Sequence, residues 1–539
     1  MVEPSHSPSH RQLLSRAQAP EMGGRRIDAI IVPSARSAPY LRHAAGLAEG
    51  LGATLVVLCS PHPRGRARAR DIVADLSDRY PLVGLVAVDM PPALDHPMPR
   101  FETSKMLAGT RFERRTDTSL KRNLGLLLAR SVGWHRVVFL DDDIHVEDPA
   151  DLCRAVSLLD RHYAVGLSVG GYPDNSVVCH AHRDTGGWQE TFVGGGALAV
   201  RADRVESFFP NVYNEDWLFL LDDVRLRPVA ETGTAKQQPY DPFANPERAR
   251  GEEFGDDLAE GVFALLDRGG RVQDADEQYW RGFLAARGKL ILDIIERTKK
   301  LDDMEPGQRQ RMLASLRAAY GRLQCAPPDL FVRYLRAWRA DGTRWRRCLA
   351  ELPTDLSVEK ALVHLGLAGR YTTRWSEIRP AGPGDLSHLL SALGQEHYFA
   401  DRLDRQAAGR GVLLVALIDS RPVGHVYLSL EPAEEEDLRR YLPGVPLLCH
   451  LEVLPELRSR GIGSAIMTTA EAELRRRGHR MVVLGVDLDN HRAAELYHRL
   501  RYRPWAYGPV ETTREVVRPD GRTERVPDKC RIFVKKLSG

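Results

Sequence analysis

Short apolar runs alternate with amphipathic stretches over the first half of the chain. Four of these runs have the length and composition of strands that are buried on both faces of a sheet: residues 28–33, 53–59, 85–89 and 136–140. Between them, apolar side chains recur at helical spacing in residues 40–51 and 119–130, and Gly52 and Gly133 end the two stretches. This alternation predicts a parallel α/β domain, which we place at residues 26–275.

The pattern changes twice after this domain. Residues 276–366 have helical character, with proline-containing breaks at 305–307 and 326–328, and we expect a helical extension and linker there. A second alternation of strand and helix occupies residues 372–539 and predicts another α/β domain. Residues 1–25 are rich in Ser, Pro, His and Arg and lack an apolar segment, so we expect a disordered tail. The expected fold class is multidomain α/β.

Composition narrows the class of protein. A chain of 539 residues is long enough for two or three domains. With 76 basic and 73 acidic residues, the net charge of +3 gives no drive toward nucleic acid or an anionic membrane. Seven cysteines, an odd number without a CxxC pair, argue against a zinc site or a disulfide framework and fit the reducing cytoplasm. No apolar stretch is long enough to span a bilayer.

A glycine-rich turn joins a strand to a helix in the second α/β domain. The strand is expected at residues 447–454, and the helix begins beside Gly461 and Gly463. The N–H groups at a helix N-terminus bind anions, and glycines let the backbone approach a pyrophosphate closely. The residues that we expect to bind a cofactor in this segment are Val453, Leu454, Arg458, Ser459, Arg460, Gly461, Ile462, Gly463 and Ser464.

A second motif follows a further strand, which is expected at residues 481–487. Asn490 is placed to cap a helix, along which apolar residues share one face at helical spacing: Ala493, Leu496, Tyr497 and Leu500. An aromatic residue, Tyr502, follows this helix.

Together the two segments resemble the signatures of the GNAT superfamily. The first signature, Arg/Gln-x-x-Gly-x-Gly/Ala, is matched by Arg458, Gly461 and Gly463. The second, Asn-x-x-Ala-x-x-Leu-Tyr followed by an aromatic residue, is matched by Asn490, Ala493, Leu496, Tyr497 and Tyr502. Arg501 stands where the family usually has glycine, a departure that we expect to alter only a turn. The resemblance implies an N-acetyltransferase that uses acetyl-CoA or another acyl-CoA.

The resemblance also implies roles for individual residues. The cofactor, which Asn490 also helps to bind, would lie between the two strands where they separate, and the N–H near Val453 would polarise the thioester carbonyl. Glu452, or His450 two residues earlier, would accept a proton from the amine. Tyr497 would protonate the leaving thiolate. Each role has a purely structural alternative, since Tyr497 could serve only to pack its helix and Glu452 could be a surface carboxylate.

The first α/β domain carries a cluster of carboxylates. Asp141, Asp142 and Asp143 directly follow the strand at residues 136–140, and the carboxyl ends of parallel strands are where α/β folds bind ligands. Clustered carboxylates repel one another unless a cation such as Mg²⁺ or Mn²⁺ is present. This element resembles the DxD motif of GT-A nucleotide-sugar transferases, which implies that Asp141 lies near the nucleotide and that Asp141 and Asp143 serve as metal ligands.

Two later elements resemble the same family. The glycine run 194–196 resembles its acceptor loop, and residues 214–217 resemble its Glu-Asp element, in which Asp216 would deprotonate an acceptor hydroxyl. No histidine lies between Trp217 and the helical segment to act as a further metal ligand, so metal dependence stays open. The acidic run 252–257 either borders this site or begins a helix.

These features leave three hypotheses. The chain is a bifunctional enzyme, or an acetyltransferase whose N-terminal domain only recognises a nucleotide or sugar, or a regulatory protein without turnover. Under the first two, the substrates are a small-molecule amine and possibly a sugar acceptor, with no nucleic acid or membrane partner. The sequence does not determine the acceptors, the nucleotide base, the sugar or the oligomeric state.

Overall fold

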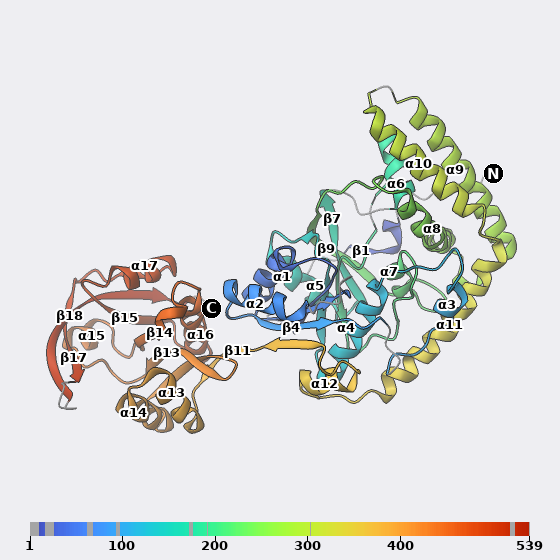
Figure 1. Cartoon of the computed structure of the whole chain (residues 1–539). Helices are drawn as coiled ribbons and strands as arrows, with labels where there is room; N and C mark the ends of the chain where they lie inside the picture. Colours follow the sequence, from blue (N-terminus) through green and yellow to red (C-terminus); the bar gives the residue numbers. More distant parts are fainter. Residues whose placement is uncertain are drawn as a thin grey trace. The chain divides into compact units, whose positions relative to one another are not determined.

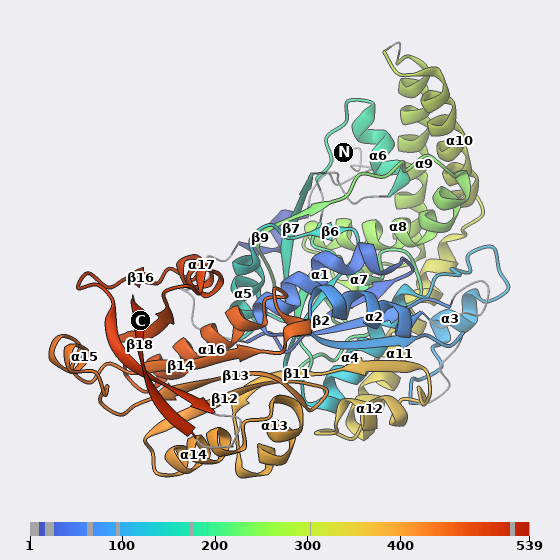
Figure 2. The same ribbon diagram turned by 60° about the vertical axis from the view of Figure 1, so that its left-hand side comes forward.

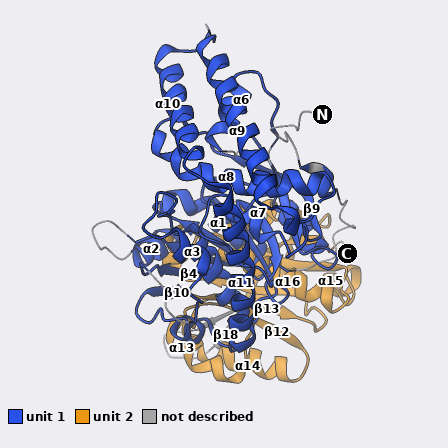
Figure 3. Cartoon of the chain, turned by 90° about the vertical axis from the view of Figure 1, so that its right-hand side faces the viewer, with its two compact units in different colours: residues 1–76, 83–373 blue, residues 77–82, 374–539 orange. Residues whose placement is uncertain are grey.

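The computed structural model describes residues 10–16, 26–61, 68–92, 97–171, 176–190, 192–301, 303–517 and 523–537. The chain forms two compact units (Figure 3). The first comprises residues 1–76 and 83–373, and the second comprises residues 77–82 and 374–539. The helical segment that we expected as an extension belongs to the first unit. Among the described residues, no helix combines the length and apolar character needed to cross a membrane.

The first unit is built on one mixed sheet. Its strands are β1 (Ser15–Arg16), β2 (Ala29–Ser34), β3 (Thr54–Cys59), β4 (Gly84–Asp89), β5 (Arg136–Leu140), β6 (Ile144–His145), β7 (Ala164–Gly171), β8 (Ala197–Arg201), β9 (Val229–Gln237) and β10 (Tyr371–Arg374). They lie in the order β1-β9-β7-β8-β5-β2-β3-β4-β10, and β6 pairs with β9. The four predicted strands pair in parallel as β5-β2-β3-β4. The sheet is not wholly parallel, however, because β8 runs antiparallel to both β5 and β7.

Helices cover both faces of this sheet. They are α1 (Ala38–Leu51), α2 (Ala69–Arg79), α3 (Glu102–Leu107), α4 (Thr118–Val132), α5 (Pro149–Leu158), α6 (Val177–Asp184) and α7 (Glu215–Phe219). Figures 1 and 2 place α1 on one side of the sheet and α4 on the other. α4 packs closely because Gly125 has no side chain: a Cβ atom there would lie 3.0 Å from Ile31 and 3.2 Å from Phe139.

The predicted helical segment consists of the long helices α9 (Glu277–Lys299), α10 (Pro306–Leu323) and α11 (Pro328–Glu351) and the short α12 (Val358–His364) (Figure 1). A further long helix, α8 (Pro246–Asp267), precedes this segment. Both predicted breaks are confirmed, since Pro306 begins α10 and Pro328 begins α11, positions where the missing N–H of proline costs nothing. The fully buried Trp280 packs on α8 at Gly261, where a Cβ atom would lie 2.3 Å from its ring.

The expectation of a disordered tail is wrong for residues 10–16. They form a short 3-10 helix (η1, Arg11–Leu13) and the strand β1, which pairs in parallel with β9. His10 is buried, with Nδ1 at 2.5 Å from Asp267 and Nε2 at 3.2 Å from Glu260. Ion pairs to a distant helix therefore order a segment whose own composition gives no sign of structure. The remainder of the expected tail lies outside the described residues.

The second unit is a mixed sheet with helices on both faces. Its strands are β11 (Ser376–Pro380), β12 (Gly411–Ile418), β13 (Arg421–Ser429), β14 (Leu447–Val453), β15 (Met481–Asp487), β16 (Arg503–Pro504), β17 (Val510–Val517) and β18 (Thr523–Lys536). Its helices are α13 (Leu386–Leu393), α14 (Glu396–Ala407), α15 (Glu436–Tyr441), α16 (Ile462–Arg476) and α17 (His491–Arg499). The sheet order is β11-β12-β13-β14-β15-β18-β16, and β17 pairs with β18.

Strand β12 shows how this sheet holds two cores. Its even-numbered residues, from Val412 to Ile418, pack in one cluster with α16 and α17. Its odd-numbered residues, from Leu413 to Leu417, pack in another with α13 and α14. Side chains alternate between the faces of a strand, so a strand that is apolar at every position requires helices on both faces, as Figure 2 shows.

Candidate functional site

Two neighbouring strands of the second unit separate at the point where the sequence predicted a cofactor. β14 and β15 run parallel and pair only at Leu447 with Val483 and at Leu448 with Leu484. On its other edge β15 pairs with β18 along its whole length. The residues of β14 that follow Leu448 have no pair on β15, so the two strands separate toward the carboxyl end of β14. An extended ligand can form hydrogen bonds with backbone groups exposed in this way.

The glycine-rich turn follows β14 and starts α16. Gly461 is the N-cap of α16 with a φ of 85°, a left-handed conformation that favours glycine, and no side chain caps the helix. The first N–H groups of the helix are thus free to bind an anion. At Gly463, by contrast, a Cβ atom would meet nothing closer than 3.7 Å. The packing of the protein does not require glycine at this second position, whereas a closely bound ligand would.

Several predicted cofactor residues make contacts within the turn. Arg458 Nε donates to the carbonyl oxygen of Val453 at 2.8 Å, which links the turn to the end of β14. Ser459 Oγ accepts from Arg492 at 2.8 Å, so a further cation lies beside the turn. Leu454 N–H donates to Val423 at 2.9 Å, and this group is therefore engaged within the sheet.

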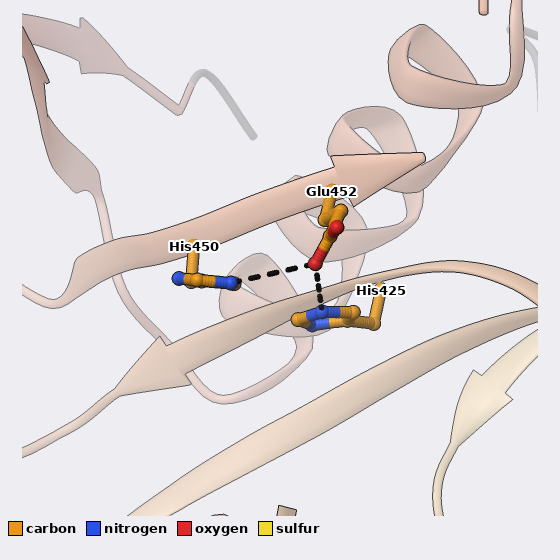
Figure 4. Close-up of side chains that lie close together, drawn as sticks. All are labelled: His425, His450 and Glu452. Atoms are coloured by element: carbon orange, nitrogen blue, oxygen red, sulfur yellow. Dashed lines mark hydrogen bonds and ion pairs between the residues drawn. The ribbon is translucent and has the colours of Figure 1, made fainter. Parts of the chain in front are cut away.

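The two candidate bases of β14 lie together at a β-bulge. The pairing of β13 with β14 shifts register, so that His450 and its neighbour face a single residue, and His450 has a φ of 56°. His450 Nε2 lies 3.5 Å from a Glu452 oxygen. The same oxygen lies 3.4 Å from Nε2 of His425 on β13, and Gln395 donates to it at 2.8 Å (Figure 4). Glu452 is therefore the centre of a polar cluster and not an isolated surface carboxylate.

His425 is the member of this cluster that the sequence reasoning missed. It stands directly opposite Glu452 across the two strands. Its side chain is fully buried, and burial lowers its pKa below the usual value. The contacts from His425 and His450 hold the pKa of Glu452 well below its usual range. The only feature of the sequence that could have indicated a role for His425 is that it is a lone histidine in an otherwise apolar strand. The strand pairing that places it opposite Glu452 cannot be predicted from the sequence.

Tyr497 lies on α17 in the same core cluster as α16. Its side chain is mostly buried, and burial raises its pKa to about 12, so the phenol is protonated at neutral pH. Its ring contacts Tyr502 and Phe533, at centroid distances of 5.7 and 6.2 Å. Within the described residues the hydroxyl has no hydrogen-bond partner, so Tyr497 packs its helix and still keeps a free proton donor.

Asn490 and Arg501 mark the two ends of α17. Asn490 caps the helix, as predicted, and its side-chain oxygen accepts from Ala493 N–H at 3.1 Å. Its role in cofactor binding stays a prediction. Arg501 adopts a φ of 63°, the conformation that glycine would adopt without strain, and thus the turn geometry is kept despite the substitution.

In the first unit, the predicted carboxylates and glycines line one cavity. Its volume is about 950 Å³, and it brings together Asp141, Asp143, Gly194, Gly196 and Asp216. The two aspartates 141 and 143 follow β5, the two glycines precede β8, and Asp216 lies on the short helix α7, so only the fold brings them together. The cavity is suited to an anionic ligand, because arginines also line it. They are Arg36, Arg111, Arg114, Arg115, Arg122, Arg248, Arg250 and Arg322.

The buried Arg122 links two of the acidic groups. It donates to both oxygens of Asp141, at 3.0 and 2.9 Å, and to Glu215 at 2.7 Å. Burial, opposed by Arg122 and reinforced by the charge of Asp143, raises the pKa of Asp141 to about 6. For Glu215 burial acts in the same direction, but Arg114 and Arg122 outweigh it and lower its pKa. The sequence reasoning did not pair Arg122 with Asp141.

Residues that follow or end β2 neutralise the charges of Asp142 and Asp143 or donate hydrogen bonds to them. Arg36 lies 3.4 Å from Asp142 and donates to Asp143 at 3.1 Å, and Ser34 donates to Asp142 at 2.5 Å. Guanidinium groups therefore neutralise much of the aspartate cluster. Asp141 and Asp143 as ligands of Mg²⁺ or Mn²⁺ stay a prediction.

Contacts of Asp216 and Arg122 explain the first two glycines of the run 194–196. Asp216 accepts from Gly195 N–H at 2.5 Å and from Trp217 N–H at 3.0 Å. A Cβ atom on Gly194 would lie 2.8 Å from Asp216, and one on Gly195 would lie 2.5 Å from the Arg122 guanidinium. Burial, with the charge of Glu215, raises the pKa of Asp216.

The acidic run 252–257 lies in the middle of α8, which begins earlier, at Pro246. The expectation that the run begins a helix is therefore wrong. Glu252 and Asp256 line the cavity, which confirms the alternative that the run borders this site. Both are buried, and Arg287 donates to Asp256 at 2.5 Å.

Comparison with known proteins assigns the second unit. Residues 379–502 match the model of the acetyltransferase (GNAT) family. The chain thus contains a C-terminal GNAT acetyltransferase domain, as its two signatures predicted, within a multidomain α/β protein. The match lies within the second unit and does not extend to the first. No curated protein matches the chain.

Solved structures with similarity to the chain include several acetyltransferases. The ribosomal-protein-S18-alanine N-acetyltransferase from Escherichia coli is 18% identical, with a TM-score of 0.23, and covers 30% of this chain and 95% of its own. A putative acetyltransferase from Salmonella typhimurium with its cofactor acetyl-CoA is 20% identical, with a TM-score of 0.22, and covers 30% and 94%. The PaiA N-acetyltransferase from Thermoplasma acidophilum, in complex with coenzyme A, is 17% identical, with a TM-score of 0.20, and covers 30% and 98%.

Proposed function

We propose that the second unit transfers an acetyl group from acetyl-CoA to the amine of a small molecule. One arrangement supports this proposal above all: the glycine-rich turn, the separated strands β14 and β15 and the His450–Glu452 pair occur together in a GNAT domain. The N–H groups at the start of α16 bind the pyrophosphate, and the pantetheine lies between the two strands. The N–H of Val453 polarises the thioester carbonyl.

The proton transfers follow from the polar cluster. Glu452 is already contacted by Gln395 and His425, whereas His450 is about half exposed and has no hydrogen-bond partner at Nδ1 within the described residues. We therefore assign His450 as the base and Glu452 as the carboxylate that orients it through Nε2. His450 removes a proton from the ammonium, and the free amine attacks the carbonyl carbon. The C–S bond then breaks, Tyr497 gives its proton to the thiolate, and the second proton of the nitrogen passes to solvent as the amide forms.

The release of free CoA thiol from acetyl-CoA tests this proposal. A panel of small amines is offered to the full-length protein, and thermal unfolding is followed with acetyl-CoA and other acyl-CoAs. We expect stabilisation by acetyl-CoA and amine-dependent thiol release. An absence of any shift with all acyl-CoAs would contradict the proposal at its first step.

We further propose that the first unit binds a nucleotide sugar and transfers the sugar. The supporting observation is that the aspartate cluster, the glycine run and Asp216 line one cavity together with several arginines. The arginines suit a diphosphate, and Asp216, whose pKa is raised, suits a base that deprotonates an acceptor hydroxyl. If a divalent ion such as Mg²⁺ or Mn²⁺ takes part, Asp143 and Asp141 would hold it, and it would offset the negative charge of the diphosphate.

A test separates catalysis from recognition in this unit. Thermal unfolding with UDP- and GDP-sugars, with and without Mn²⁺, reports binding. Sugar transfer or hydrolysis that is lost in Asp143→Asn supports a transferase. Binding without turnover in the unaltered protein supports a recognition module that serves the acetyltransferase.

A further inference from the structure

We propose that His425, His450 and Glu452 form a binding site for a first-row transition metal ion, with Zn²⁺ as the best match, and that occupation of this site blocks acetyl transfer. Metal binding itself is independent of the proposed function, whereas the inhibition rests on it. The three side chains come from the neighbouring strands β13 and β14 and converge on one point (Figure 4).

The distances between the three side chains fit tetrahedral coordination. The Nε2 atoms of His425 and His450 lie 3.4 and 3.5 Å from the same Glu452 oxygen, which is long for a hydrogen bond. Two ligands that are each about 2.0–2.1 Å from Zn²⁺, at a tetrahedral angle, lie roughly 3.3–3.4 Å apart. All three ligand atoms lie within 4.8 Å of one another. A small shift of the side chains therefore suffices to place an ion between them.

The donor types select a class of ion. Two imidazole nitrogens and one carboxylate oxygen suit Zn²⁺, Co²⁺ or Ni²⁺, whereas Mg²⁺ and Ca²⁺ require sets of oxygen ligands. No neighbour fixes the tautomer of His425, since its buried Nδ1 has no hydrogen-bond partner in the described part of the chain. A proton at Nδ1 leaves Nε2 free to bind the ion.

The surroundings provide rigidity on one side and access on the other. His425 is fully buried beside Phe399, at a centroid distance of 4.9 Å, and the Tyr398 ring lies 4.7 Å from that of His450. His450 is 46% exposed, which leaves an entry path and a fourth position for water. Gln395 donates to the Glu452 oxygen and holds the carboxylate in place, the kind of support that metal ligands require.

Occupation of the site would remove the base. An ion bound to Nε2 of His450 makes the ring a weaker proton acceptor and separates it from Glu452. A general base typically contributes about 10²–10⁴-fold to a rate, so bound Zn²⁺ should lower turnover by at least about 10²-fold. Removal of the ion by a chelator should restore it.

Cobalt provides the direct test of binding. Metal-free full-length protein is titrated with Co²⁺, and we expect one equivalent to give the intense visible absorption of a tetrahedral ion, with Zn²⁺ displacing it and Mg²⁺ having no effect. The spectrum should be lost in Glu452→Gln and His450→Gln. It should persist in His388→Gln, an exposed histidine of α13 outside the cluster. Loss of signal in both ligand variants does not depend on the buried His425, whose substitution could impair folding. The absence of a tetrahedral spectrum, or its persistence in both variants, overturns the site.

A second measurement tests inhibition. Thiol release from acetyl-CoA by the protein is measured with Zn²⁺ and after chelation. Reversible loss of turnover at the metal concentration that displaces Co²⁺ supports the proposal. Full turnover with one bound equivalent of Zn²⁺ overturns the inhibitory role. A protein that binds Co²⁺ but shows no acetyl transfer under any condition contradicts the proposed function and leaves the metal site standing.

Discussion

Asp141 in the first unit and Glu452 in the second have almost the same exposure, yet their surroundings move their pKa values in opposite directions. The side chains are 28% and 29% exposed. For Asp141, burial in the cavity and the charge of Asp143 outweigh the contact with Arg122 and raise the pKa to about 6. For Glu452, contacts from His425 and His450 prevail and lower it. The exposed fraction of a carboxylate therefore does not by itself decide the direction of its pKa shift: desolvation by the surrounding protein prevails at Asp141, and hydrogen-bond donors prevail at Glu452.

The largest expected effect concerns the compensating cation of the first unit. Arg122→Gln leaves Asp141 and Glu215 without their shared partner beside Asp216. Removal of one member of a buried ion pair costs about 3–5 kcal/mol of unfolding free energy. Hydrogen exchange during denaturant titration should show this loss in α4, while β14 keeps its protection.

The control for this prediction is Arg115→Gln, which alters an exposed arginine that also lines the cavity. The loss there should stay within about 0.5 kcal/mol. If both variants were equally stable, the buried network would not be what stabilises the first unit.

The next effect concerns catalysis in the second unit. Tyr497→Phe should lower turnover about 10²-fold, since an acid in the transition state is lost. Acetyl-CoA affinity and thermal stability should hardly change, because the hydroxyl has no protein partner within the described residues. Steady-state kinetics and a binding titration measure both. Tyr507→Phe, at an exposed tyrosine, serves as the control. Unchanged turnover in Tyr497→Phe would remove this residue from the acid role.

A smaller effect distinguishes the two glycines of the cofactor turn. Gly461→Ala places a Cβ atom at a φ of 85° and should cost about 1–2 kcal/mol of stability. Gly463→Ala has room for its Cβ atom and should be neutral or slightly stabilising in thermal unfolding without ligand. It should still weaken acetyl-CoA binding. An equal loss of stability in both variants would contradict this division between conformation and ligand approach.

The most local effect is a dependence on pH in the first unit. The ion pairs with Asp267 and Glu260 outweigh burial and raise the pKa of His10 from 6.5 to about 9. The resulting stabilisation is complete below about pH 6.5 and is lost as pH rises through 9. Hydrogen exchange of residues 10–16, corrected for the intrinsic pH dependence, should lose protection across this window. Exchange in β14 should not change.

The matched variant is His10→Gln, which keeps a hydrogen-bonding group and cannot take up the charge. Its residues 10–16 should exchange faster than those of the unaltered protein at neutral pH, and the difference should disappear above about pH 9. A constant difference at every pH would show that the charge of His10 does not hold this segment.

Elements with a local signal were predictable from the sequence. The strands β2 to β5 appear as apolar runs, and α10 and α11 begin at prolines. The cofactor turn is also local, because a strand, two glycines and a helix N-terminus follow one another within about twenty residues. The same holds for Tyr497 and the Asn490 cap. The sequence by itself thus determined the GNAT domain and where its glycine-rich turn lies.

Tertiary structure decided what depends on pairing across the fold. His425 contacts Glu452 only because of the register of β13 with β14 and the bulge at His450. Arg122 forms its ion pairs with Asp141 and Glu215, which lie in other parts of the chain. Segment 10–16 is ordered by β9 and α8, far away along the chain. Burial and oppositely charged partners determine the position and the charge state of these side chains. Both depend on residues that are distant in the sequence, so the neighbouring residues in the chain do not reveal them.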